Sequence, residues 1–209
     1  MSIASANLSD VVSGRVGERP AADRFSAIQR SPAQTRILKA ALDLFAQHGV
    51  SGTSLQMIAD AVGVGKAAVY FQFKTKDELI IAVTEMQLAR LEDALEAAEA
   101  EKNRPRAREL LLNAVIDMAV EQRGMVAIMQ SDPVIIRFLA EHKPFQRFLE
   151  RLYAAMIGDE TGPETLMQAA MLSGAIGSAV KHPLVAHLDD DTLRSQLLTL
   201  TRRLIALPD

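Results

Sequence analysis

The chain has 209 residues, of which 49% are apolar, and this suffices for a packed core in one small and one medium domain. It has no cysteine, which excludes disulfides, thiol catalysis and cysteine-based zinc sites and fits a reducing cytoplasm. It lacks a signal-peptide pattern and any run of eighteen apolar residues. We therefore expect a cytoplasmic protein that does not associate with a membrane.

The net charge of −3 is unevenly distributed along the chain. Residues 1–75 hold eight Lys and Arg against five Asp and Glu, whereas the remainder holds fifteen against twenty-one. A basic N-terminal part on an acidic remainder orients that part toward a polyanion such as nucleic acid. The asymmetry is modest and does not establish DNA binding by itself.

Residues 1–30 mix Ser, Ala, Gly and Asn with scattered arginines and show no periodicity, which predicts a disordered extension. Its arginines could enter a minor groove, but a solvated tail is the favoured interpretation. Three capping boxes then mark helix starts: Ser31-Pro32-Ala33-Gln34, Thr53-x-x-Gln56 and Thr75-x-x-Glu78.

Residues 53–72 predict two short helices joined by a turn. In the first, the apolar residues recur at helical spacing, and Ala59 is small enough for a second helix to cross closely. Gly63 follows where a sharp turn requires positive φ. The second helix, Lys66 to about Gln72, has one inward anchor, Val69. Such a helix serves to present its outer surface, as in a helix-turn-helix that docks on DNA.

The outward residues of this second helix suit contact with DNA. Lys66 can reach a phosphate or a guanine edge, and Ala67 and Ala68 can pack on thymine methyl groups. Tyr70 can donate its hydroxyl to a phosphate or pack its ring in the core, and both remain open. Phe71 is more typical of a core ring, although so short a helix leaves it partly exposed.

Further DNA-contact candidates flank these residues. Thr53, Lys74 and Lys76, with the free N–H groups at the start of the next helix, are expected to hold phosphates without contacting bases. Gln56 is a candidate as well, unless the capping box occupies its side chain.

Residues 35–79 resemble the TetR family of bacterial transcriptional repressors. The residues that carry the resemblance are Ile37, Ala41, Leu44, Phe45, His48, Gly49, Thr53, Ile58, Ala59, Gly63, Val64, Lys66, Val69, Tyr70, Phe73, Lys76 and Leu79. The resemblance implies a helical DNA-binding head, a larger ligand-binding and dimerisation body, and repression relieved by a small molecule. Gly65 stands where the family usually has Ser or Thr, and Phe71 where it often has a polar residue. These departures concern the operator sequence rather than the fold.

We expect an all-α fold with a disordered extension at 1–30, a three-helix DNA-binding domain at 31–75 and a ligand-binding and dimerisation domain at 76–209. A long helix from Lys76 to about Lys102 should turn Leu79, Val83, Met86, Leu91 and Leu95 inward and Glu85, Glu92, Asp93, Glu96 and Glu99 outward. Further helices are expected at 106–122, 124–130, 133–141, 144–157, 163–180 and 190–206.

The middle helices carry methionines and aromatic residues, which suit an adaptable apolar pocket, although an ordinary core is the alternative. The family resemblance, rather than composition, favours the pocket, with Gln122 and Gln130 as further polar candidates. The expected pocket residues are Met86, Asp117, Met118, Met125, Met129, Phe138, His142, Phe145, Phe148 and Tyr153.

The last two helices show the pattern of a helical dimer interface. Small residues at Ala170, Gly174 and Gly177 permit close approach of helices. Leucines then recur at spacings of four, three and four, as in a coiled coil, and two such helices from each subunit would form a four-helix interface. Burial inside one subunit is the alternative. The leucines are Leu193, Leu197, Leu200 and Leu204.

An enzyme is the competing class, and the sequence offers it little. The histidines form no metal-binding spacing, and phosphate-loop and nucleophile-elbow motifs are absent, so we expect no enzymatic activity, cofactor or metal. We predict a homodimeric repressor that leaves operator DNA when it binds a small apolar or amphipathic effector. The alternative is an activator, or a regulator that acts through a protein partner without an effector.

Overall fold

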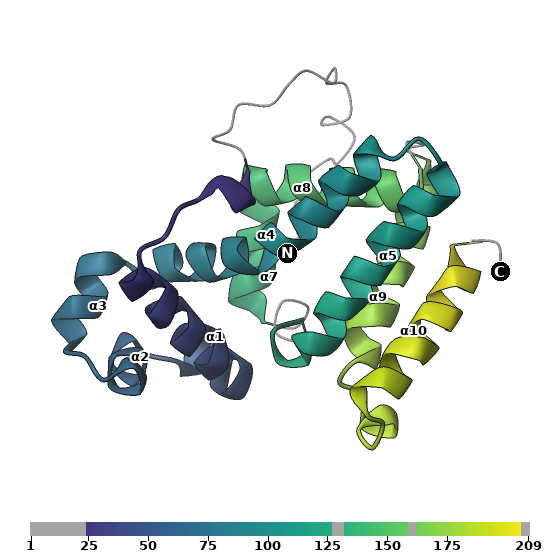
Figure 1. The fold of residues 1–209 in the computed structure, drawn as a ribbon. Coiled ribbons are helices and arrows are strands. Elements are labelled where there is room, and N and C mark those ends of the chain that lie inside the picture. Colours follow the sequence, from purple (N-terminus) through teal and green to yellow (C-terminus); the bar gives the residue numbers. More distant parts are fainter. Residues whose placement is uncertain (1–23, 127–131, 159–161, 206–209) are drawn as a thin grey trace, which may run out of the picture.

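The computed structural model describes residues 24–126, 132–158 and 162–205, and within these ranges the regular secondary structure is helical (Figure 1). The expected all-α class is therefore confirmed. The helix bounds agree with the expected ones to within two residues where both can be compared, while the expected helix 124–130 lies partly outside the described residues. The elements are η3 (Phe25–Ala27), α1 (Pro32–Gly52), α2 (Leu55–Val62), α3 (Lys66–Gln72), α4 (Lys76–Ala100), α5 (Arg104–Glu121), α7 (Pro133–Glu141), α8 (Lys143–Met156), α9 (Pro163–Ala179), η4 (Pro183–Val185) and α10 (Asp190–Leu204).

Local hydrogen bonds explain where the first helices begin and end. Ser31 and Gln34 form the expected capping box, in which each side chain accepts the other residue's backbone N–H. The second expected capping box is wrong, because the N-cap of α2 is Ser54, which accepts the N–H of Met57. Thr53 instead ends α1, after a break at Gly49, whose φ is 71°.

Two apolar cores hold the fold together, and α4 contributes to both. The head core combines α1, α2 and α3 with the α4 residues Leu79, Ile80, Ala82 and Val83. The body core combines the later part of α4, from Leu88 to Ala98, with α5, α8, α9 and α10. In Figure 1 this helix runs from the head into the body. A rigid helix therefore connects the two cores.

Other contacts seal the junction between head and body. Met125 and Ile135 come from the body's sequence range but are buried in the head core. The carboxylate of Asp132 accepts the N–H of Val50 at the end of α1, at 3.1 Å. A Cβ placed on Gly124 would lie 2.8 Å from the Cβ of Ala46, so the backbone here requires glycine for its close approach to α1.

The structure corrects two expectations about the first part of the chain. Residues 24–30 are not disordered, because Phe25 is buried in the body core and η3 packs on α4. The rest of the expected extension, 1–23, lies outside the described residues. Glu92, expected to face outward, is only 1% exposed, because the same N-terminal segment and α8 cover it.

Candidate nucleic-acid interface

The turn between α2 and α3 sets the angle at which α3 leaves the head. Gly63 adopts the left-handed conformation, with φ 76° and ψ 37°, as the sequence predicts. Its N–H is directed to the carbonyls of Ala59 and Asp60, and the N–H of Val64 also reaches Ala59, at 3.0 Å. These bonds close α2 and direct the chain into α3.

The short helix α3 is fixed by a single buried side chain. Val69 is fully buried in the head core, and Phe73 is buried just beyond the helix end. The other side is open: Tyr70 is 42% exposed and Phe71 is 75% exposed. The exposed residues of α3 are Lys66, Ala67, Ala68, Tyr70 and Phe71. We call this set the α3 face, and its exposure agrees with the expected orientation.

Two lysines lie against the aromatic rings of the α3 face. The Nζ of Lys66 is 5.6 Å from the ring centroid of Tyr70, and that of Lys74 is 5.3 Å from the centroid of Phe71. Both lysines are exposed at the surface. Phe71 therefore is not the core ring that its residue type suggested. The surface combines positive charge with apolar area, which suits phosphates and thymine methyl groups respectively.

Thr53 departs from its expected place in this surface. It is only 2% exposed, and its hydroxyl donates to the carbonyls of Leu44 at 3.2 Å and Gly49 at 2.9 Å. The side chain thus closes the end of α1 and is not directed to a phosphate. The capping-box pattern indicated Thr53 as the N-cap of α2, whereas the N-cap is the next residue, the exposed Ser54.

The remaining candidates lie at the surface on either side of α3. Gln56 is exposed and donates to Asp60 at 2.7 Å, so it is not held in a capping box. At the start of α4, Thr75 accepts the N–H of Glu78 at 3.0 Å, and the Glu78 carboxylate accepts the N–H of Lys74 at 2.7 Å. These bonds hold Lys74 and the half-exposed Lys76 next to the α3 face.

Part of the expected ligand pocket lines a small cavity among the described residues. A cavity of about 10 Å³ lies between α4, α5 and the residues after α5, and the atoms exposed in it are apolar. Met118 and Met125 of the expected pocket line it, together with Gln122, one of the further polar candidates. Sequence analysis missed Gln87 on α4, although its place in the apolar stripe between Val83 and Leu91 was a signal. The lining residues are Gln87, Leu88, Met118, Gln122, Met125 and Val126.

The other expected pocket residues have different surroundings. Phe145 and Phe148 pack in the body core, where Phe25 of the chain itself lies against both rings. Asp117 forms an ion pair with Arg194 at 3.2 Å. His142 precedes α8, and burial lowers the pKa of its ring below the ordinary value. Met86 and Tyr153 are half-buried.

Three further candidates for the pocket cannot be placed in this way. Met129, Gln130 and the side chain of Phe138 lie outside the described residues.

The structure divides the expected dimer-interface residues between the subunit core and the surface, where Ala170, Gly174 and Leu200 remain accessible. Leu193 and Leu197 are buried inside the subunit, and Leu204 packs against the same body core, because α10 lies along α5. Gly177 is buried too. The exposed part of α9 and α10 instead presents Leu166, Met167, Ala170, Met171 and Leu200, with the half-exposed Gly174 among them. We call this set the α9–α10 face.

Comparisons with known proteins identify the class of protein that carries this geometry. A family model described as bacterial regulatory proteins of the tetR family matches residues 37–83, which include α2, α3 and the start of α4. The HTH-type transcriptional regulator Mb3439c of Mycobacterium bovis is 32% identical over 165 residues, which are 71% of this chain and 88% of the relative. The chain belongs to the TetR family. It is a DNA-binding transcriptional regulator, not an enzyme, as the sequence predicts.

Other transcriptional regulators resemble this chain over different lengths. AcrR of Shigella flexneri is 50% identical over 50 residues, and the match spans only 24% of this chain and 23% of AcrR. FadR of Bacillus subtilis, solved in complex with stearoyl-CoA, superposes with a TM-score of 0.61 at 18% identity over 84% of this chain and 99% of FadR. At that identity the likeness establishes the shared fold.

Two further observations concern only the residues that the structure describes. None of their helices combines the length and hydropathy that crossing a membrane requires. No three His, Asp or Glu side chains among them gather in a way that could hold a metal ion.

Proposed function

We propose that this TetR-family regulator docks the α3 face in the major groove of a near-palindromic operator. The observation that carries the proposal is the exposure of every α3 side chain from Lys66 to Phe71 except that of Val69. A helix held by one anchor leaves its other side chains free to contact base edges. Lys74, Lys76 and the N-terminus of α4 then hold the adjacent phosphates.

The regulator acts as a homodimer in this proposal, because two reading helices require two half-sites about one helical turn or more apart. The α9–α10 face supports the assignment of the interface. It groups exposed Leu166, Met167, Met171 and Leu200 with small residues that permit close helix packing. An isologous contact of this face with its own copy would bury these side chains.

Repression relieved by an apolar or amphipathic effector is the finer part of the proposal. The cavity beside Gln87 and Gln122 is a candidate entry point, since Met125 lines it and is also buried in the head core. A ligand that widened this space would displace Met125 against the head. The resemblance to FadR, a protein solved with stearoyl-CoA, supports a search among molecules with apolar chains.

One observation favours a second candidate, a regulator without a small-molecule effector. In the described ranges the cavity measures about 10 Å³, far below the several hundred Å³ that a drug-sized ligand occupies. An effector that entered this cavity would therefore require the body to open. A protein partner or a constitutive repressor requires no such opening.

Selection of duplexes from a random-sequence library tests the DNA part of the proposal. The expected result is an enriched near-palindrome bound by two chains. Enrichment of an asymmetric site bound by one chain would contradict it. Titration of the enriched complex with fatty acids and acyl-CoA thioesters then tests the effector, and an affinity for DNA that none of these molecules changes would favour the second candidate.

A further inference from the structure

The segment before α1 is attached to one face of α4 by three polar contacts. Arg24 pairs with Glu96, the backbone N–H of Ser26 donates to Glu92 at 3.1 Å, and Arg30 pairs with Glu85 at 2.7 Å. The three glutamates are spaced seven and four residues apart, which places them on one side of the helix. Residues 24–30 therefore run antiparallel to α4, and we call them the strap.

The strap is anchored in the body by an aromatic ring. Phe25 is 6% exposed and stacks on Phe145 with ring centroids 5.3 Å apart, while Phe148 meets it edge-on at 5.7 Å. Both partner rings belong to α8. The ring of Phe25 therefore depends on the spacing between α4 and α8, and a separation of these helices would expose it.

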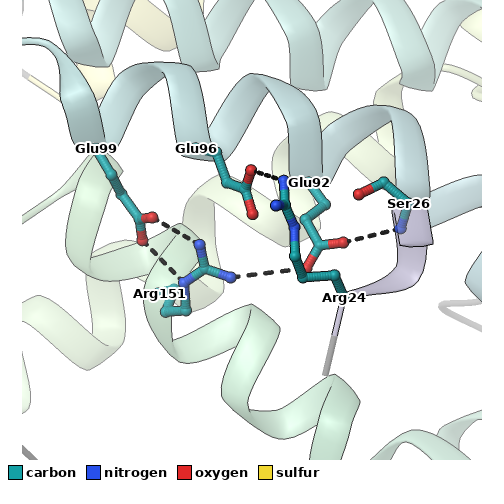
Figure 2. A network of polar contacts seen from close by, with 6 residues as sticks. All are labelled: Arg24, Ser26, Glu92, Glu96, Glu99 and Arg151. Carbon is teal, nitrogen blue, oxygen red and sulfur yellow. Dashed lines mark hydrogen bonds and ion pairs between the residues drawn. The ribbon is translucent and has the colours of Figure 1, made fainter. Parts of the chain in front are cut away.

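A buried carboxylate joins the same three elements, as Figure 2 shows. Glu92 on α4 is 1% exposed and lies between the Ser26 N–H and Arg151 of α8, whose guanidinium is 3.8 Å away. Arg151 also makes two hydrogen bonds to Glu99, at 2.9 and 2.6 Å. Movement of α8 away from α4 would thus take Arg151 away from Glu92 and would also remove the two α8 rings on which Phe25 packs.

The other end of the strap is attached to the DNA-binding head. Arg30 directly precedes Ser31, the N-cap of α1, and α1 packs on α2 and α4. The Arg30 and Glu85 side chains are 15% and 17% exposed, so this pair is well shielded from solvent. Displacement of the strap would therefore act on the start of α1 without passing along α4.

We propose that the strap is a second mechanical link between body and head, and that its docked form belongs to the DNA-binding state. The inference rests on the proposed function, in which the closed, ligand-free body binds the operator. An opening of α4 from α8 undocks Phe25, releases the start of α1 and weakens operator binding.

Hydrogen exchange of the peptide covering residues 24–30, together with affinity for the selected duplex, tests this link. Phe25→Ala should speed exchange in the strap at least about tenfold and weaken operator binding roughly fivefold or more, the lower range of measured couplings between sites. Ile28→Ala, at an exposed strap position, is the matched control and should change neither quantity.

A charge swap provides a second test that does not remove a core ring. Arg30→Glu and Glu85→Arg should each release the strap and weaken binding, whereas the double variant restores the pair and both wild-type values. If Arg30 instead contacts DNA directly, the double variant would stay weak, and the inference would be overturned.

Two other outcomes would also overturn it. Strap amides that exchange in the wild type as fast as in an unfolded chain would show that the strap is not docked. If Phe25→Ala released the strap but left the affinity for an enriched duplex unchanged, the strap would only cover the body core and would not affect DNA binding. A wild-type chain that enriches no duplex would instead overturn the proposed function and the link together.

Discussion

Thr53 and Ser54 show how far sequence reasoning reaches at the scale of single residues. Both are typical N-caps, and a Gln follows Thr53 at capping-box spacing, so the pattern favoured Thr53. The break at Gly49 decides otherwise, because it turns the end of α1 so that the Thr53 hydroxyl reaches the carbonyls of Leu44 and Gly49. This tertiary arrangement leaves no periodic signal in the sequence.

The hydroxyl of Thr53 should therefore matter for stability rather than for phosphate contact. Thr53→Val leaves two carbonyl acceptors without this donor and should lower the free energy of unfolding by about 1–2 kcal/mol, measured by denaturant titration. Thr53→Ser keeps the hydroxyl and is the matched control. A stable Thr53→Val variant that binds DNA more weakly than Thr53→Ser, with an unchanged salt dependence, would restore the phosphate role.

Glu92 is a second residue whose surroundings could not be predicted from its own helix. It lies seven residues after Glu85 and four before Glu96 on a helix rich in acids, and such residues usually face solvent. What buries it is a segment more than sixty residues earlier in the chain, through Ser26, together with Arg151 of α8. Contacts of this range have no local pattern.

At the scale of elements, caps and glycines made the first helices predictable. The bounds of α3, its anchor Val69 and the left-handed Gly63 all follow from the expected helix-turn-helix. The direction of α10 did not follow, because a leucine repeat fits burial against α5 as well as contact with a partner chain. Leu193 and Leu197 are buried in the body core, on the side of α10 that packs against α5.

The turn itself offers a test with two glycines only two residues apart. Gly63→Ala forces a Cβ into the left-handed region, at φ 76°, and should lower the free energy of unfolding by about 1–2 kcal/mol. Gly65 has φ −69° and open space around it, so Gly65→Ser should be neutral or stabilising by a few tenths of a kcal/mol as a new N-cap. Thermal or denaturant unfolding measures both variants. If the two variants lost the same free energy of unfolding, the left-handed conformation of Gly63 would not be the reason for the loss.

At the scale of the whole molecule, the shared helix α4 joins a head that the sequence identifies well to a body that it identifies poorly. The head carries a specific motif, and its core residues match it from Ile37 to Val83. The body is defined by helix packing over long sequence separations. Among the described residues, Phe145 and Phe148 of the expected pocket therefore lie in the body core, and Met118 and Met125 line a small cavity.

We predict that the dimer interface lies on the exposed α9–α10 face and not on the buried side of α10. Met167→Glu with Met171→Glu places charges on exposed positions and should yield folded monomers, because the charges would meet their copies across a two-fold axis. Leu197→Glu, in contrast, places a charge in the subunit core and should unfold the chain. Light scattering and circular dichroism distinguish these outcomes, and a folded double variant of unchanged dimer mass would show that the interface lies elsewhere.

The central claim is that the α3 face binds DNA, and a fluorescence anisotropy titration of the selected duplex tests it most directly. The protein to titrate carries Lys66→Ala, Tyr70→Ala and Phe71→Ala, all at exposed positions, and Lys102→Ala at the exposed far end of α4 is the control for lost charge. We expect the triple variant to keep its unfolding temperature but to lose at least about tenfold in affinity, while the control binds as the wild type does. A folded triple variant that binds the duplex with wild-type affinity would show that the α3 face does not bind DNA.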